Sequence, residues 1–371
     1  MFDTGDHVVL LTRLHNRYGI KGTAQKWFRS YLTNRTQSVI IDKCESNQKK
    51  LNYGVPQGSK LGPVLFNTYI APLSNIAVNH GVTDQKYADD EQLVLSFRPD
   101  TTSNVKNAYD KMEKCIHDIR LFLHNNKLSN NADKTEFILI GSKHNLNSIH
   151  RKNLMVNNIT LNSMEQVRNL GVIFDKEMKM DKQVAKMCQK TFLNIKNIAY
   201  IRKNLSKNDT KTVVNALVIP HLDYGNAVLT GISAKNIRKL QVAQNSAARL
   251  IERLRKFDRI SHIRKDLHWL PIQARIDYKV IYLTWKTINN QAPKYLRDMI
   301  KDTTHVRNMR SNNQRNLDVQ RCINNYGTRA FSVIAPKLWN KLPVDIKNIK
   351  ENHIFKKRLK THLFKLHYDN A

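Results

Sequence analysis

Two stretches decide the fold of this 371-residue chain: GVPQGSKLGPVLF at residues 54–66 and KYADDEQLVL at residues 86–95. The first begins with the glycine and proline of a loop and continues into apolar residues, and Pro63 suits the first turn of a helix. In the second, Asp89 and Asp90 separate two short segments of strand character. The stretches therefore predict a loop leading into a helix over about 64–79, then a hairpin whose tight turn holds the acids.

The pattern outside these stretches alternates helical and extended segments. Helical spacing of apolar residues predicts two helices before residue 33, a long helix over about 104–126 and helices from about 180 onward. Strands are expected at residues 38–41, 51–55 and 135–141, with further short strands between 154 and 174. The chain is thus predicted to be mixed at the front and helical at the rear.

The composition points to a polyanionic partner. Lys and Arg number 62 against 30 Asp and Glu, a formal charge of +32, and 41% of the residues are hydrophobic, enough for real cores. Nucleic acid is the usual partner of so basic a protein, and an anionic membrane is the alternative. An apolar run long enough to span a bilayer is missing from the sequence, and the early acids do not fit a secretory signal. The four scattered cysteines fit a reduced intracellular compartment.

Several further motifs follow the first two in a recognisable order. Together these residues resemble the reverse transcriptases of jockey-type, LINE-like retrotransposons without long terminal repeats, and the resemblance covers nearly the whole chain. The added motifs are Asp133-Lys134-Thr135, Asn169-Leu170-Gly171-Val172 with Asp175, Asp223-Tyr224-Gly225-Asn226, residues 244–250, Leu267-His268-Trp269-Leu270-Pro271 and residues 335–340.

The resemblance implies an α+β fold in three parts. Residues 1–176 would form a truncated right-hand polymerase palm with part of the fingers, built as an antiparallel sheet with helices. Residues 177–230 would form a helical thumb, and residues 231–371 a basic, mainly helical carboxy-terminal domain. That last part holds 30 Lys and Arg against 10 Asp and Glu, so most of the excess positive charge lies there.

The implied activity is RNA-directed DNA polymerisation by two divalent ions, Mg²⁺ or Mn²⁺. Asp89 and Asp90 are the expected metal ligands, with Asp89 in direct contact and Asp90 in a weaker role. Lys134 resembles the lysine that acts as a general acid toward the leaving pyrophosphate. Taken alone, the two acids would more often be a solvated turn, and Lys134 could equally be a surface lysine.

The resemblance also implies residues that bind the nucleotide and template: Phe2, Gln57, Gly58, Ser59 and Tyr87. Phe2 matches the aromatic that excludes the ribose 2′-hydroxyl, and the Gln57 amide and Ser59 hydroxyl are available as hydrogen-bond partners. The alternative for the glycine-bearing stretch is an ordinary strand-to-helix turn capped by Ser59.

The rear of the chain is expected to hold nucleic acid by its backbone. Lysines that lie mostly off the apolar stripe of the helix after residue 180 are the candidates, and a solvated basic face is the alternative. They are Lys182, Lys186, Lys190 and Lys196. A basic amphipathic helix over 356–365 could grip nucleic acid, direct the chain to the nucleus, or simply pack on the tail.

The family pattern places a first metal-binding aspartate five residues before the aromatic at Phe2, which is three positions before Met1. The chain is therefore predicted to be a fragment that is inactive alone, with the amino-terminal half of the same polyprotein as its missing partner. The expected ligands are an RNA template, a DNA primer and deoxynucleoside triphosphates, with no membrane, and the expected location is the nucleus. The alternative function is a non-catalytic nucleic-acid-binding remnant or domesticated scaffold.

Overall fold

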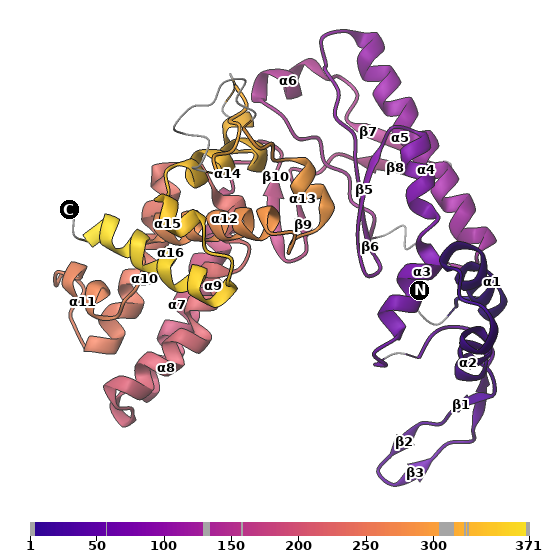
Figure 1. The fold of residues 1–371 in the computed structure, drawn as a ribbon, viewed down its shortest axis with the longest axis horizontal. Helices are drawn as coiled ribbons and strands as arrows, with labels where there is room; N and C mark the ends of the chain where they lie inside the picture. Colours follow the sequence, from indigo (N-terminus) through magenta and orange to yellow (C-terminus); the bar gives the residue numbers. More distant parts are fainter. Residues whose placement is uncertain are drawn as a thin grey trace. The chain divides into compact units, whose positions relative to one another are not determined.

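The computed structural model describes residues 4–56, 58–128, 134–156, 159–303, 315–322, 324 and 326–368. The chain divides into two compact units, residues 1–167 and 168–371 (Figure 1). The predicted boundaries at 176 and 230 stay predictions, because the second unit holds both the expected thumb and the expected tail.

The first unit combines helices with short antiparallel strand pairs. Its helices are α1 (His7–Tyr18), α2 (Gly22–Leu32), α3 (Gly62–Ile70), α4 (Leu73–Asn79), α5 (Thr102–Asn125) and α6 (Lys143–Ser148). Its strands are β1 (Arg35–Gln37), β2 (Ile40–Ile41), β3 (Cys44–Glu45), β4 (Lys49–Leu51), β5 (Thr83–Tyr87), β6 (Asp90–Val94), β7 (Asn153–Val156) and β8 (Ile159–Asn162).

Each strand pair of the first unit is a separate two-stranded sheet: β1 with β4, β2 with β3, β5 with β6, and β7 with β8. The mixed α+β class is thus confirmed, whereas the described residues do not form the single larger sheet expected of a palm. A fifth strand pair, β9 (Gln166–Asn169) with β10 (Val172–Asp175), begins at the boundary between the two units.

The core of the first unit lies where α1, α3 and α5 meet. Tyr69 of α3 is buried, and its hydroxyl donates to the carbonyl of Asn126 at 2.8 Å. The guanidinium of Arg13 lies over the Tyr69 ring, 4.6 Å from its centroid, and bonds to the Tyr69 carbonyl and the Asn126 side chain. Because each of these groups belongs to a different element, the contacts fix α1 against α3 and the end of α5.

Three expected elements of the first unit are wrong in detail. The strand expected at 51–55 is displaced, because β4 already ends at Leu51 and only Tyr53 of the remaining residues makes a bridge, with Asp6. The helix expected over 64–79 is divided into α3 and α4 around Pro72, which lacks the N–H that a continuous helix would need. The strand expected at 135–141 is reduced to one bridge, between Phe137 and Ser163. The run of apolar residues there packs into a small core around Leu139 rather than into a sheet.

The second unit is helical. Its α-helices are α7 (Asp181–Ile201), α8 (Lys207–Leu217), α9 (Ile219–Asp223), α10 (Ala234–Glu252), α11 (Ser261–Asp266), α12 (Ile272–Ile288), α13 (Lys294–Asp298), α14 (Phe331–Asn340), α15 (Val344–Lys347) and α16 (Asn352–Tyr368). Short 3₁₀ turns lie at Arg202–Asn204, Asn226–Leu229 and Gly327–Arg329. None of the helices in the described ranges is long and apolar enough to cross a membrane.

In this unit the sequence motifs contact one another. The Tyr224 hydroxyl donates to the Leu170 carbonyl at 2.6 Å, and a Cβ on Gly171 would lie 3.3 Å from the Tyr224 ring. The Gln244 side chain donates to the Leu270 carbonyl at 2.9 Å. Stretches recognised separately in the sequence therefore hold each other in place.

A second core of this unit is aromatic. The Trp285 ring is fully buried, stacks on Phe355 at 4.9 Å between centroids, and donates from its indole N–H to the Ile349 carbonyl at 2.7 Å. The contact joins α12 to α16, which explains why the basic terminal helix packs one face inward.

We expect Trp285→Ala to lower the free energy of unfolding of the second unit by about 3–5 kcal/mol, because it leaves a large cavity and an unused carbonyl. Chemical unfolding followed by the fluorescence of the remaining tryptophans measures this. Phe257→Ala, at a side chain that is 89% exposed, is the control and should cost less than about 0.5 kcal/mol. Equal effects of the two substitutions would contradict the packing described here.

Candidate active site and nucleic-acid interface

The predicted acids lie at the tip of a regular hairpin. β5 and β6 pair in antiparallel register, with Tyr87 opposite Asp90, so that Ala88 and Asp89 form a two-residue turn. Ala88 has φ +55°, in the left-handed region that such tight hairpin turns use. Asp89 and Asp90 are both exposed, and Tyr87 is 67% exposed. The hairpin expected from the sequence is confirmed, with both carboxylates held out at its end.

A cluster of four polar side chains, which was not predicted from the sequence, holds the hairpin against α4. The Ser74 hydroxyl of α4 donates to the Asp84 carboxylate at 2.7 Å and accepts from the Lys86 ammonium at 2.8 Å. The Lys86 ammonium also lies 3.0 Å from the Asp84 carboxylate, and both side chains are mostly buried. The signal was present in the alternation of strand side chains, since Asp84 and Lys86 must share one face of β5.

The fourth member of the cluster is Glu91, which lies opposite Lys86 in the ladder. The residue as a whole is exposed, but its side chain is only 22% exposed, with its carboxylate 4.0 Å from the Lys86 ammonium. Burial raises the pKa of Glu91 to about 7, with Asp84 adding to the rise and Lys86 opposing it. For Asp84, burial also acts to raise the pKa, but the bonds from Ser74 and Lys86 outweigh it and the pKa is lowered.

The glycine-bearing loop uses its hydroxyl internally. Ser59 donates to the Pro56 carbonyl at 2.8 Å and accepts from the Gly62 N–H, at the start of α3, at 3.0 Å. A Cβ on Gly62 would lie 2.9 Å from the Pro56 carbonyl oxygen, so this turn admits only glycine there. Gly58 has φ +77°. The alternative of a turn capped by Ser59 is met only in part, because the N-cap of α3 is Leu61 and has no side-chain cap. The only proton of the Ser59 hydroxyl is already donated.

The remaining predicted site residues of the first unit are less constrained. Lys134 is exposed. Phe2 and Gln57 lie outside the described residues, so their predicted contacts with nucleotide and template stay predictions. The roles predicted for Gly58, Ser59, Tyr87 and Lys134 likewise remain predictions.

The carboxylates fit a divalent ion only in part. Aspartate oxygens are the ligands that Mg²⁺ and Mn²⁺ prefer. Within the described ranges, however, no three His, Cys, Asp or Glu side chains come close enough together to hold a metal ion. Asp89 and Asp90 are adjacent in the chain and share one tip, so they do not by themselves make the two-ion clamp that nucleotidyl transfer needs.

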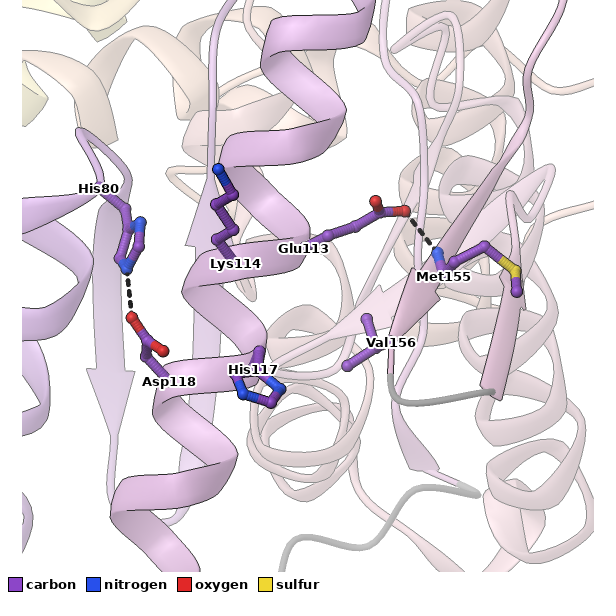
Figure 2. A pocket seen from close by; sticks show the side chains of 7 residues that line it. All are labelled: His80, Glu113, Lys114, His117, Asp118, Met155 and Val156. Carbon is purple, nitrogen blue, oxygen red and sulfur yellow. Dashed lines mark hydrogen bonds and ion pairs between the residues drawn. The ribbon is translucent and has the colours of Figure 1, made fainter.

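A surface hollow of about 320 Å³ lies elsewhere in the unit, over α5 and β7 (Figure 2). His80 and Asp118, which both line it, are joined at 2.7 Å. Glu113 accepts from the Met155 N–H at 2.6 Å and pairs with Arg151. These polar groups are occupied in holding α4, α5 and β7 together, and the hollow does not include the hairpin acids.

The four predicted lysines of the second unit lie along α7. Lys182, Lys190 and Lys196 are exposed and Lys186 is half-buried. At 100° per residue the four fall within an arc of about 120°. The buried side of the same helix, which includes Val184, Thr191 and Ile198, lies opposite this arc. The helix therefore presents one positively charged face, as the sequence predicted.

The front of the chain is similar to a known protein family. The family described as reverse transcriptase (RNA-dependent DNA polymerase) matches residues 6–174, a range that contains the loop, α3 and the hairpin with its acids. Residues 6–174 are thus similar to the reverse transcriptase family.

Retrotransposon proteins are similar to the chain over a longer range. The RNA-directed DNA polymerase from mobile element jockey of Drosophila funebris is 25% identical over 249 residues, 64% of this chain and 26% of that protein. The probable RNA-directed DNA polymerase from transposon BS of Drosophila melanogaster is 25% identical over 260 residues, 67% of this chain and 28% of that protein. The chain thus spans about a quarter of the length of these relatives. The resemblance to jockey-type reverse transcriptases is confirmed.

The raised pKa of Glu91 makes the stability of the first unit depend on pH. Because that pKa, about 7, lies above the ordinary value of 4.5, the folded chain binds this proton more tightly than the unfolded chain. The favourable contribution of protonated Glu91 is complete below pH 4.5 and is lost as the pH rises through 7. We expect Glu91→Gln, which stays neutral, to gain about 1–3 kcal/mol in unfolding free energy over wild type between pH 4 and pH 8.

Chemical unfolding followed by circular dichroism at pH 4, 6 and 8 measures this difference. Gln85→Glu places a carboxyl on the exposed face of the same hairpin and is the matched control, which should leave the pH dependence of the wild type unchanged. Parallel curves for Glu91→Gln and wild type across this range would show that the carboxyl is not buried as described.

Proposed function

We propose that this chain is the polymerase-bearing part of a non-LTR retrotransposon protein that copies RNA into DNA. The observation that carries the proposal is the β5–β6 hairpin, which lies within the residues matched by the reverse transcriptase family and holds Asp89 and Asp90 exposed at its tip. The substrates would be an RNA template, a DNA primer and deoxynucleoside triphosphates. The names of the similar proteins support the same activity.

In this proposal the first unit acts as the palm, and the helices that begin with α7 act as the thumb. Asp89 and Asp90 would be ligands of Mg²⁺ or Mn²⁺, with Asp89 in the more direct position. Tyr87 and Gly58 would lie beside the nucleotide and template, as would Phe2 and Gln57. Lys134 would donate a proton to the departing pyrophosphate. A location in the nucleus, where a retrotransposon must reach DNA, belongs to the same proposal.

We further propose that residues 1–371 do not polymerise by themselves. Two neighbouring carboxylates cannot hold two ions while leaving room for phosphate oxygens, and the described residues bring no third carboxylate to them. Losing about 4 kcal/mol of transition-state stabilisation already slows a reaction about a thousandfold. The third ligand would have to come from outside the described residues.

The first test is primer extension on a homopolymer RNA template with Mg²⁺ or Mn²⁺. We expect no extension above background from the 371-residue chain, and no change on Asp89→Ala, because the ion clamp is incomplete. Extension that Asp89→Ala abolishes would overturn the proposed inactivity.

The polymerase assignment itself needs a context with a complete ion clamp. A chimera provides it, with residues 6–174 replacing the corresponding segment of the Drosophila funebris jockey polymerase. The chimera should extend the primer, and Asp89→Ala should abolish extension while leaving its circular dichroism unchanged. A folded chimera that is inactive would favour a non-catalytic nucleic-acid-binding role.

The lysine face of α7 should grip the nucleic-acid backbone without regard to sequence. We expect replacement of its four lysines by Gln to weaken binding and to lower the slope of log K against log salt by about 3, because each lost phosphate contact removes roughly 0.7–0.9. A gel-shift titration over a range of salt concentrations measures both.

A control with the same loss of charge separates this face from the net charge of the chain. Four exposed lysines of the first unit serve: Lys106, Lys111, Lys143 and Lys152. Their replacement by Gln should change the slope much less. An equal change in both sets would leave general charge, and not the α7 face, as the cause.

A further inference from the structure

Two aromatic rings and a guanidinium group form a strip along one face of α2 that reaches β1. The strip consists of Trp27, Tyr31 and Arg35. The Trp27 and Tyr31 rings are nearly parallel, with an interplanar angle of 11° and centroids 5.4 Å apart. The Arg35 guanidinium lies over the Tyr31 ring at 5.4 Å. Successive members are four residues apart, so the strip runs along one side of the helix and continues onto the strand that follows.

Trp27 is the more exposed of the two rings in the strip. Phe28 and Tyr31 pack against the core of the first unit. The Trp27 and Phe28 rings meet edge to face, with their centroids 5.1 Å apart. The Trp27 side chain remains 53% exposed, whereas Trp269, Trp285 and Trp339 are at most 5% exposed. Trp27 itself is not among the residues that pack on this core. The exposed indole therefore offers a flat apolar surface to a ligand.

Positive charge predominates in the segment that carries the strip. Residues 22–51 contain six Lys and Arg against two Asp and Glu. The register of β1 with β4 places Gln37 opposite Lys49 and Arg35 opposite Leu51, so Arg35 and Lys49 lie on the same face of this sheet. Both are exposed. A ligand stacked on the rings would thus meet cations along the same side.

Flat rings beside cations match the chemistry of an unpaired nucleic-acid strand. Each base presents a π-face that stacks on an aromatic ring, and each phosphate needs a positive partner. A duplex offers no free base face along its length, which disfavours it. A second copy of the chain is disfavoured by charge, since both copies would carry +32.

We propose that the strip Trp27–Tyr31–Arg35 is a stacking site for single-stranded nucleic acid. A base stacks on the exposed Trp27 ring, and Arg35 and Lys49 hold the adjacent phosphates. The site adds to the proposed polymerase function but does not depend on it, since binding there requires neither the divalent ions nor Asp89 and Asp90.

The fluorescence of the intact 371-residue chain provides a direct readout. Because the other three tryptophans are buried, iodide in solution should quench the emission of Trp27 selectively. We expect a 15-nucleotide oligo(dT) or oligo(U) to shield Trp27 from iodide as binding saturates. Oligo(dT) and oligo(U) separate a preference for DNA from one for RNA, and either preference supports the stacking site.

Affinity is measured separately by the anisotropy of labelled oligonucleotides. Trp27→Ala should weaken binding roughly tenfold or more, the range found for loss of one stacked base, and Trp27→Phe should retain most of the affinity. Leu121→Ala, at a 48% exposed residue of α5, is the matched control and should have no effect. The series is repeated with the four α7 lysines replaced by Gln, so that their contribution cannot hide the loss.

Three results would overturn the proposal. The first is that Trp27 remains fully open to iodide at saturating oligonucleotide. The second is that a blunt 15-base-pair duplex binds and shields Trp27 as well as the single strands do, since base stacking then plays no part. The third is shielding that increases with protein concentration in the absence of oligonucleotide, which would assign the strip to self-association. None of these outcomes bears on primer extension.

Discussion

The candidate active site depends on how one hairpin is closed and held. Ala88 closes the two-residue turn in a left-handed backbone conformation, and this turn places Asp89 at the tip with Asp90 as the first residue of β6. Below the tip, Lys86 and Asp84 are tied to Ser74 of α4, so the strand cannot slide along the helix without breaking buried polar contacts. The position of the acids is therefore set by polar contacts on the opposite face of the same strands.

The motifs of the two units have different surroundings. In the first unit the acidic turn holds Asp89 and Asp90 exposed, whereas the glycine-bearing loop uses the Ser59 hydroxyl in its own hydrogen bonds. In the second unit the recognised residues form joints, such as Tyr224 with Leu170 and Gln244 with Leu270. Residues recognised in the sequence can thus lie at an exposed tip or in contact with each other, and only the tertiary structure distinguishes the two cases.

Two helices of the chain, α7 and α2, each carry positively charged groups along one face. On α7 the lysines lie opposite a buried apolar stripe, so the helix needs one side for its core and leaves the other for a polyanion. On α2 the aromatic strip adds stacking to charge. Backbone charge alone binds any nucleic acid, whereas stacking selects strands whose bases are unpaired.

Local spacing and motif order were enough to predict the helices α1, α2, α5 and α7, the acidic hairpin and the resemblance to reverse transcriptases, because these depend on residues close together in the chain. Spacing and motif order did not determine the division at Pro72, the loss of a strand at 135–141, or the tie of Ser74 to Asp84 and Lys86. These features depend on partners distant in the chain. The apolar residues around Leu139 pack into a small core instead of pairing with another strand. Ser74 reaches Asp84 and Lys86 only because α4 packs on β5. Exposure of Trp27 was also decided by tertiary structure, since helical spacing marks a face as apolar but does not say whether the fold covers it.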